Sequence, residues 1–573
     1  MKTKLFIVLL FLIFTSLNAQ NNIGVDYYNV KEYELAKKYF LRELPNNPAE
    51  ANYYLGEIAF AEGRLDEAAQ YYNQGLQSAT DPYCRIGLAK IDLKTGRKVE
   101  ATSTLVAIQK KYPKEIDILT AIGYAYLENQ LYDDVQSLLK TMQRIDNSNP
   151  KIYVLEGDML RADKNTNKNI GASAGKYDMA IYFDPNFALA YMKMAEVYEK
   201  SSWQMAVEKL KELIQRKPDY IIAYRYLGKI YTSNGYYQSA LDAFKTYFAA
   251  GNYTLDDIAR YVTALYFSKN YDDAYKMIKE GLAVDPNYFV LNRLQMYLAA
   301  NTLNTDAGLN YATHFFSLKP KQAGDYIALD YSMYALILKE AKKYDEAFIQ
   351  YKQALDMDST SISIYKDIAN IAGLKGQNDL AADYYTSYIN KSADKVDVRD
   401  YFQLGRYYYS ASTIRTASDT LYMLNKKQDP LFIKTIAENE LQRDSLQNFK
   451  QLFIEKAIKY YLIQADKVFD KVIELAPDGY TGYLWKARTN SLIDADSEMG
   501  LAKPFYEKTI EILSNGYDVT APGVKNMLIE AYSYLGYFYY IKNDSPNTIL
   551  FWNKVLELDP QNANANAVLK EIK

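Results

Sequence analysis

Hydrophobic and small residues recur along the chain at helical spacing, and short polar turns interrupt them. The clearest window covers residues 224–248. Its first part places apolar or small residues at positions i, i+3, i+4 and i+7, the period of one helix face: Tyr224, Leu227, Gly228 and Tyr231. A Ser-Asn-Gly turn at 233–235 ends this pattern, and a second helical pattern follows at Tyr237, Ala240, Leu241, Phe244 and Phe248. The window predicts a helical hairpin.

The same pattern returns through most of the chain at a spacing of 34 residues. Ala240 and Ala274, which open two successive second helices, are 34 residues apart, as are Ala347 and Ala381. A Leu-Gly pair marks the first helix and recurs at Leu55-Gly56, Leu404-Gly405 and Leu535-Gly536. Glycine and alanine at these positions indicate a close approach of two helices, because a larger side chain would force them apart.

The order of residues in one unit is an aromatic, Leu-Gly, Tyr, a turn, a small residue, an aromatic and a closing Pro, and it resembles the tetratricopeptide repeat. The resemblance implies an all-α fold, an α-solenoid wound as a right-handed superhelix of about fourteen helix-turn-helix repeats around a concave groove. One hairpin cannot bury its apolar face alone, so successive repeats are expected to cover one another. Residues 561–573 are expected to form a capping helix.

The pattern predicts four regions: a signal peptide at 1–19, an N-terminal repeat array at 20–410, a helical insertion at 411–457, and C-terminal repeats with the cap helix at 458–573. The insertion contains helical patterns at 431–441 and 446–458. Two interpretations stay open for it, a docking element specific to one partner and a surface insertion that the solenoid tolerates. A shorter Asn/Lys-rich surface loop is predicted at 163–169.

The amino terminus has the features of an export signal. Lys2 and Lys4 precede an apolar run at 5–14, and Ala19 supplies a small residue for cleavage before Gln20. We expect an exported protein that is periplasmic, either free or associated with the outer membrane, and that does not insert into the membrane after cleavage. Within the last fifth, Trp485-Lys486-Ala487-Arg488 and the segment 500–508 are similar to exported bacterial envelope proteins of the tetratricopeptide repeat family.

Composition limits the classes of partner. The chain has 67 basic against 70 acidic residues, a balance that gives no indication of a nucleic-acid or anionic-membrane partner. Cys84 is the only cysteine, so no intramolecular disulfide can form, and no cysteine stands at the cleavage point for a lipid anchor. Tyrosine is unusually frequent, at 58 residues, and suits packed helices with hydrated edges.

Motifs for catalysis and metal binding are sparse. His314 is the only histidine, so we expect no metal cluster of histidine and cysteine, and no cofactor. The segment 171–175 matches the nucleophile-elbow pattern around Ser173, which leaves a serine hydrolase using Ser173 and His314 as a remote alternative; no buried strand precedes the serine. The same segment lacks one residue and the Ser or Thr of a phosphate-binding loop. Carboxylates at 494–498 are expected to form a capping turn rather than a calcium loop.

Recognition is therefore expected on the groove. In the tetratricopeptide family the first helix of each repeat lines the groove at defined positions, and aromatic and arginine side chains are common interface anchors. Lys366 and Asn370 also repeat the Lys-xxx-Asn spacing of the family's carboxylate clamp, although Gln403 stands where the next unit would need Asn. The residues that this register places toward the groove are Tyr53, Phe60, Tyr124, Arg225, Lys229, Tyr266, Lys366, Asn370, Phe402, Arg406, Tyr409, Tyr537 and Tyr540.

The leading hypothesis is a non-enzymatic scaffold or adaptor of the bacterial cell envelope. It would bind a protein or peptide partner in the groove or at the helical insertion, within an envelope complex. The alternative is the capture of a peptide or glycan by stacking on Tyr53, Tyr409 and Tyr537.

Overall fold

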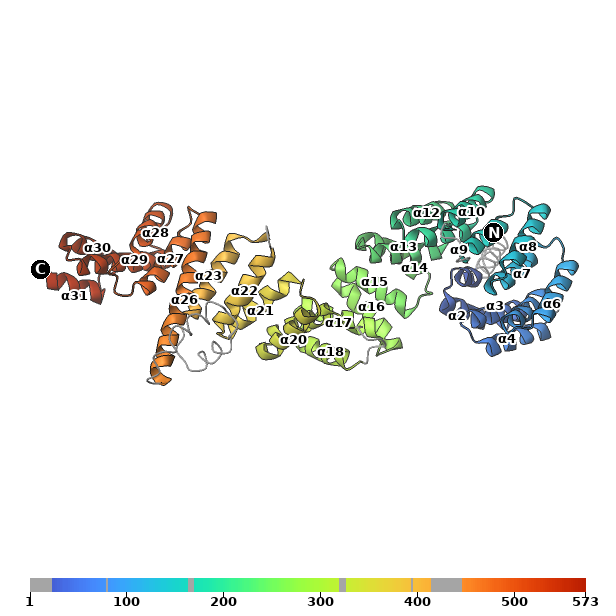
Figure 1. Cartoon of the computed structure of the whole chain (residues 1–573), viewed down its shortest axis with the longest axis horizontal. Helices are drawn as coiled ribbons and strands as arrows, with labels where there is room; N and C mark the ends of the chain where they lie inside the picture. The colour runs from blue at the N-terminus through green and yellow to red at the C-terminus, as the bar shows by residue number, and fades with distance from the viewer. Residues whose placement is uncertain are drawn as a thin grey trace, which may run out of the picture. The chain divides into compact units, whose positions relative to one another are not determined.

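The computed structural model describes residues 23–78, 81–162, 169–318, 326–392, 395–413 and 446–572. Regular structure in these ranges is helical and contains no strand, and twenty-nine helices form fourteen hairpins followed by one last helix. The predicted all-α solenoid is thus confirmed. The chain divides into two compact units, one up to Leu298 and one from Ala299. Within each unit the helices lie side by side in chain order (Figure 1).

The first unit opens with a short helix at residues 23–29. It continues with α2 (Tyr33–Glu43), α3 (Pro48–Ala61), α4 (Leu65–Ser78), α5 (Pro82–Lys94), α6 (Lys98–Lys111), α7 (Ile116–Glu128), α8 (Tyr132–Ile145), α9 (Pro150–Ala162), α10 (Asn169–Phe183), α11 (Ala188–Glu199), α12 (Trp203–Arg216), α13 (Ile221–Ser233), α14 (Tyr237–Ala249), α15 (Leu255–Phe267) and α16 (Tyr271–Val284). Helix α17 (Phe289–Asn301) carries the boundary between the units.

The second unit contains the remaining helices. These are α18 (Thr305–Ser317), α19 (Ala328–Glu340), α20 (Tyr344–Met357), α21 (Ile362–Leu374), α22 (Asn378–Ser392), α23 (Val398–Ala411), α26 (Leu446–Leu475), α27 (Tyr480–Ile493), α28 (Lys503–Gly516), α29 (Pro522–Ile541), α30 (Ser545–Leu558) and α31 (Ala563–Ile572). No helix in the described ranges is both long and apolar enough to cross a bilayer.

The turns inside the hairpins depend on left-handed backbone. Gly235 follows α13 with a φ of 78°, and Gly63 follows α3 with a φ of 79°. This conformation ends a helix and reverses the chain, and glycine adopts it without a steric penalty. Lys269 occupies the same place after α15 with a φ of 61°. The Ser-Asn-Gly turn predicted at 233–235 therefore closes its hairpin as expected.

In several hairpins a glycine of the first helix receives an aromatic ring from the second helix. A Cβ added to Gly228 would lie 2.6 Å from the ring of Phe244, and one added to Gly405 would lie 2.5 Å from the ring of Phe469. Gly56 meets Tyr72 in the same way, and Gly536 meets Trp552. The small residue and the aromatic residue of the repeat are thus two halves of one contact.

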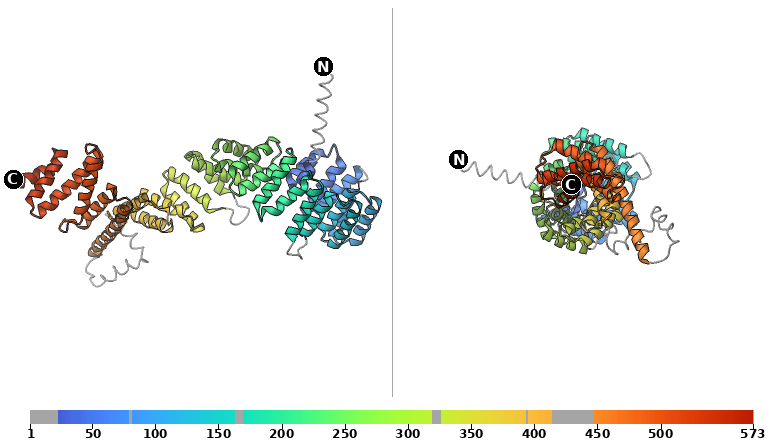
Figure 2. Two further views of the ribbon diagram at one scale, coloured as in Figure 1. Left: turned by 90° about the horizontal axis from the view of Figure 1, so that it is seen from above. Right: turned by 90° about the vertical axis from the view of Figure 1, so that its left-hand side faces the viewer.

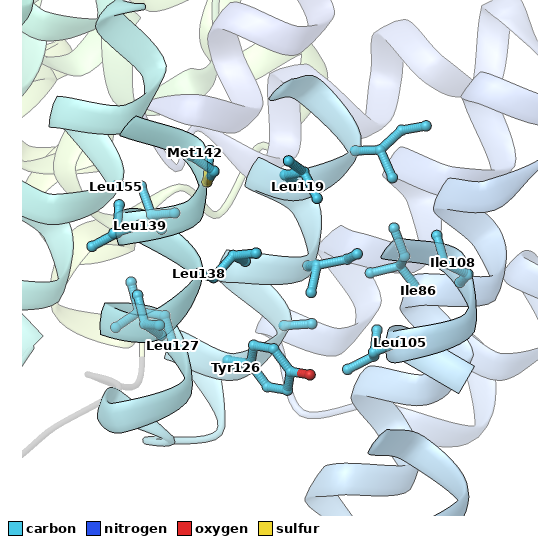
Figure 3. Close-up of a cluster of buried hydrophobic side chains, with 14 of the residues drawn as sticks. Ile86, Leu105, Ile108, Leu119, Tyr126, Leu127, Leu138, Leu139, Met142 and Leu155 are labelled. Carbon is cyan, nitrogen blue, oxygen red and sulfur yellow. The ribbon is translucent and has the colours of Figure 1, made fainter. Parts of the chain in front are cut away.

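Buried side chains connect one hairpin to the next. A single cluster runs from Ile86 on α5 through Leu105, Leu119 and Leu138 to Leu155 on α9 (Figure 3). Because these residues come from five successive helices, the hydrophobic core is shared between neighbouring hairpins. The expectation that neighbouring repeats cover each other's apolar faces holds in this part of the first unit.

The end of the predicted insertion is part of the longest described helix. Helix α23 ends at Ala411, and the structure resumes with α26, which spans 30 residues. The predicted boundary at 457/458 falls inside α26, so the helical pattern at 446–458 and the second helix of the repeat form one continuous helix. This helix, orange in the figures, extends past its neighbours (Figures 1 and 2). The pattern at 431–441, and residues 163–168 of the predicted loop, lie outside the described residues.

The ring-on-glycine contact can be tested with two alanine substitutions. Gly228→Ala should destabilise the first unit by about 1 to 3 kcal/mol, because the added methyl group meets the Phe244 ring. Gly175→Ala on α10 is the control: its Cβ meets nothing within 4 Å, so the helical preference of alanine should stabilise by up to about 1 kcal/mol. Urea unfolding midpoints measure both. Equal midpoints for the two variants would contradict the packing described.

Candidate functional site

A largely buried carboxylate, with 11% of its side chain exposed, links the helices of successive hairpins. Asp158 on α9 accepts hydrogen bonds from the hydroxyl groups of Tyr177 (2.7 Å) and Tyr124 (2.9 Å), and from Nζ of Lys193 (3.0 Å). Burial by itself raises the pKa of Asp158, but Lys193 and the two tyrosines outweigh it, and the pKa lies below its ordinary value. Tyr124, predicted for the groove, is therefore part of an internal network.

Two further carboxylates of the first unit have the same surroundings. Glu57 on α3 accepts hydrogen bonds from Tyr72 (2.7 Å) and from Nζ of Lys90 (2.7 Å). Asp257 on α15 accepts hydrogen bonds from Tyr247 (3.1 Å) and from Nε of Arg225 (2.7 Å). In each case one acid, one tyrosine and one cation come from three different helices. We call this arrangement the acid–tyrosine–cation network.

The second unit repeats the network twice. Asp400 on α23 accepts hydrogen bonds from Lys366 (2.7 Å) and Tyr385 (2.9 Å). Glu530 on α29 accepts hydrogen bonds from Tyr506 (3.0 Å) and from both Nε and Nη2 of Arg488, at 2.7 and 2.6 Å. Lys366 and Asp400 are 34 residues apart, which is the repeat length, so the network forms between equivalent helices of neighbouring repeats.

Residues of the first hairpin contact a helix that is distant in the sequence. Glu32 forms an ion pair with Arg225, and the hydroxyl of Tyr226 donates to the backbone carbonyl of Val30 over 3.1 Å. These contacts place the first hairpin against α13, the first helix of the seventh hairpin. Burial there raises the pKa of Asp26 to about 6. Arg225 is only 7% exposed as a result.

Three of the predicted groove residues of the first unit are buried, and the other three are half-buried with partners inside the chain. Phe60 and Tyr266 are each 8% exposed. Nζ of Lys90 lies 4.3 Å from the Phe60 ring centroid, and Tyr53 packs against Tyr54, Tyr72 and Tyr83. Lys229, half-buried, pairs with Glu199 at 3.1 Å. The physical reason is that first helices of neighbouring repeats contact one another, so these side chains fill the space between them.

Several predicted residues of the second unit also have internal partners. Lys366 pairs with Asp400, and Oδ1 of Asn370 accepts a hydrogen bond from Tyr407 over 3.1 Å, so both members of the clamp-like pair are engaged. The hydroxyl of Tyr540 donates to Glu571 over 3.1 Å. Tyr537 differs, since 45% of it is exposed. Of the three tyrosines considered for ligand stacking, Tyr537 is the exposed one, while Tyr53 and Tyr409 are half-buried.

Phe402, Arg406 and Tyr409 of α23 lie together with Trp485 and Arg488 of α27. The ring of Trp485 meets Tyr409 edge-on at 5.2 Å and Phe402 edge-on at 5.9 Å between centroids. The guanidinium carbons of Arg406 and Arg488 lie 5.6 and 5.1 Å from the Trp485 centroid. We call these five residues the aromatic–arginine cluster.

The cluster joins residues that the sequence predicts with residues that it does not. Phe402, Arg406 and Tyr409 are predicted groove positions, and the structure brings them together. Trp485 and Arg488 are not among the predicted site residues, although they stand in the segment noted for its similarity to envelope proteins. Trp485 and Arg488 are three residues apart, about one helical turn, so they lie on one face of the helix. This spacing is the sequence signal from which the pair could have been predicted.

The remaining motifs have structural explanations. Ser173 lies inside α10, fully buried, and its hydroxyl donates to the backbone carbonyl of Ile170 over 2.9 Å. His314 is exposed in the last turn of α18, in the other unit. The carboxylate of Asp494 accepts hydrogen bonds from the backbone N–H groups of Met499 (3.2 Å) and Leu501 (3.3 Å), which organises the turn after α27. Burial raises the pKa of the free Cys84 thiol to about 12.

Asp158→Asn tests the acid–tyrosine–cation network. The loss of charge leaves Lys193 unpaired and should destabilise the first unit by about 2 to 4 kcal/mol at pH 7. Because the folded pKa of Asp158 is lowered, its stabilising effect is present above the unfolded pKa of about 3.9 and lost as the pH falls further. Urea midpoints of wild type and variant should therefore converge below about pH 4.

Asp178→Asn, at an exposed position of α10, is the matched control and should change stability by less than about 0.5 kcal/mol. A difference between wild type and Asp158→Asn that stays constant down to pH 3 would show that the Asp158 carboxylate does not carry the stabilisation.

Comparisons with known proteins agree with this architecture. Two family models described as tetratricopeptide repeat match residues 21–82 and 59–123. No curated protein matches the chain. Tetratricopeptide repeat proteins generally mediate protein–protein interaction, and the family typically serves as a non-enzymatic scaffold.

Similar solved structures cover parts of the chain. The C-terminal part of a TPR repeat-containing protein from Cytophaga hutchinsonii is 26% identical and has a TM-score of 0.37, covering 54% of this chain and 98% of its own. A tetratricopeptide repeat protein from Parabacteroides merdae is 16% identical and has a TM-score of 0.30, with coverages of 44% and 97%. YrrB, described as a TPR protein with an unusual peptide-binding site, is 16% identical and has a TM-score of 0.29, with coverages of 33% and 96%. The two family matches, which lie within residues 21–123, and the recurring hairpin with its glycine–aromatic contact identify the fold as an all-α solenoid of tetratricopeptide repeats.

Proposed function

We propose that this protein is a non-enzymatic scaffold or adaptor of the bacterial cell envelope. It binds a segment of a partner protein on the aromatic–arginine cluster of the second unit. The observation that carries the proposal is the state of Arg406, an exposed arginine that lies over an aromatic platform shared by two first helices. Aromatic and arginine side chains are the commonest anchors of protein interfaces, because they combine large apolar area with directed hydrogen bonds.

The contrast between Arg406 and Arg225 supports this choice of site. Arg225 is buried and holds Glu32 and Asp257 at once, so a partner that took Arg225 would have to break two internal ion pairs. Removing one member of a buried ion pair costs about 3 to 5 kcal/mol. Among the described residues Arg406 has no ion pair, so a partner that contacts it breaks none. The predicted groove residues of the first unit therefore serve its stability, and those of α23 are available for binding.

A photo-crosslinking residue placed at Tyr409 tests this assignment in cells. We expect it to capture a distinct protein adduct, because Tyr409 contacts Trp485 at the proposed site. The control position is Ile463, 37% exposed on α26, the other helix of the same hairpin. The adducts are identified by mass spectrometry. The same adduct from both positions, or none from Tyr409, would contradict the proposed site.

The envelope location is also part of the proposal. Its support is the order of Lys2 and Lys4, the apolar run at 5–14 and the small Ala19. The mature chain would begin at Gln20 and remain in the periplasm, either free or attached to the outer membrane through its partner.

Cell fractionation and amino-terminal sequencing test the location. We expect the protein in the periplasmic or outer-membrane fraction, with Gln20 as its first residue. Replacing the apolar Leu9 and Leu10 by Arg should interrupt the hydrophobic run and retain an uncleaved chain inside the cell. Recovery of an intact, uncleaved wild-type chain in the cytoplasm would contradict export.

A further inference from the structure

Arg488 has a complete set of interactions within the chain. Its guanidinium lies over the Trp485 ring at 5.1 Å. Two of its in-plane donors, Nε and Nη2, reach the two carboxylate oxygens of Glu530 at 2.7 and 2.6 Å. This is the bidentate geometry in which a planar guanidinium matches a planar carboxylate. Arg488 therefore has both an aromatic neighbour and a carboxylate partner.

Arg406 has the first half of these interactions and lacks the second. Its guanidinium lies over the same Trp485 ring at 5.6 Å and near the Phe402 ring at 6.0 Å. Within the part of the chain that the structure describes, no carboxylate lies within 4.0 Å of it, and the residue is exposed. Arg406 is thus an exposed arginine beside aromatic rings that has no carboxylate partner among the described residues.

The geometry points to a carboxylate of the partner as the ligand of Arg406. We propose that Arg406 binds an Asp or Glu side chain of the partner segment, as Arg488 binds the carboxylate of Glu530. The inference rests on the proposed function and names the chemistry of its ligand. An arginine held against aromatic rings loses little further freedom when its fork meets a carboxylate, which favours a bidentate pair over a single hydrogen bond.

The neighbours of Arg406 indicate an acid inside a chain rather than at its end. On α23, Phe402 lies one turn before Arg406 and Tyr409 lies one turn after it. A segment that continues past its acidic residue can place apolar side chains against both rings. A terminal carboxylate would use the aromatic surface on one side alone. The expected ligand is therefore an acidic residue flanked by apolar or aromatic residues.

The two other tryptophans can be removed to make Trp485 a reporter. The chain contains three tryptophans, at 203, 485 and 552. Trp203→Phe keeps an aromatic ring against Tyr236. Trp552→Phe loses no hydrogen bond, because the buried Nε1 of Trp552 has no partner among the described residues. In the resulting full chain, tryptophan fluorescence reports the site alone.

The experiment titrates this chain with four peptides of one length. The first is acetylated and amidated and carries Glu between two Phe residues; in the second and third, Gln or Lys replaces Glu. In the fourth, the chain ends in a free carboxyl group directly after the first Phe, and additional residues before that Phe keep the length. We expect the Glu peptide to change Trp485 fluorescence saturably and to bind about tenfold more tightly than the Gln peptide. Binding should weaken with added salt, because the pair is exposed.

Arg406→Gln should remove the preference for Glu, and Arg406→Lys should restore only part of it, because an ammonium group lacks the fork. The control is Arg399→Gln, an arginine at the start of the same helix with 88% side-chain exposure, which should bind as the parent does. Circular dichroism confirms folding, which an exposed position should not affect.

Equal affinity for the Glu and Gln peptides, an unaltered Arg406→Gln variant, or no fluorescence change at millimolar peptide would overturn the inference. Tighter binding of the peptide with the free terminus would overturn the side-chain assignment. These outcomes differ from failure of the proposed function, which is measured by crosslinking at Tyr409. A partner captured there without preference for acid would leave the scaffold role standing.

Discussion

The burial of carboxylates between neighbouring hairpins is the constraint on which this structure depends. A carboxylate removed from water needs hydrogen bonds and a compensating charge, and one hairpin does not supply both. Asp158 obtains a tyrosine from α10, another from α7 and a lysine from α11. Any slip of one repeat against the next would leave the acid unpaired at a cost of several kcal/mol. Apolar contacts supply the attraction between hairpins, and the buried acids determine their register.

The same constraint divides the polar residues of the first helices into two groups. Arg225 and Lys366 face acids of the adjacent repeat and hold the solenoid together. Arg406 stands on an equivalent helix but meets aromatic rings instead of an acid. Residues that stabilise the repeats and residues that are open to a partner therefore share one face of the helices. A cation belongs to the first group when the adjacent repeat places an acid opposite it, and to the second group when it does not.

The contacts within one hairpin could be predicted from the sequence, because both partners of each contact lie within one repeat length. Gly228 and Phe244 are separated by a single turn, and the helical period places them face to face. Register alone also placed Phe402, Arg406 and Tyr409 on one helix face. Glu32 and Arg225 show the limit, since their ion pair joins hairpins nearly two hundred residues apart in the chain. Helical periodicity does not report how many hairpins make one turn of the solenoid, so it does not show which distant hairpins come into contact.

By itself, the sequence determined the hairpin, its 34-residue period, the close approach of its two helices and the class of fold, because these follow from local spacing and short-range packing. Only the tertiary structure decided which groove candidates remain accessible. A tyrosine or an arginine has the same spacing in the sequence whether it binds a neighbouring side chain or faces water. Its accessibility depends on which side chain the next repeat places opposite it. Arg488 meets Glu530 and Arg406 meets no acid among the described residues, and that distinction arises where separate helices come together.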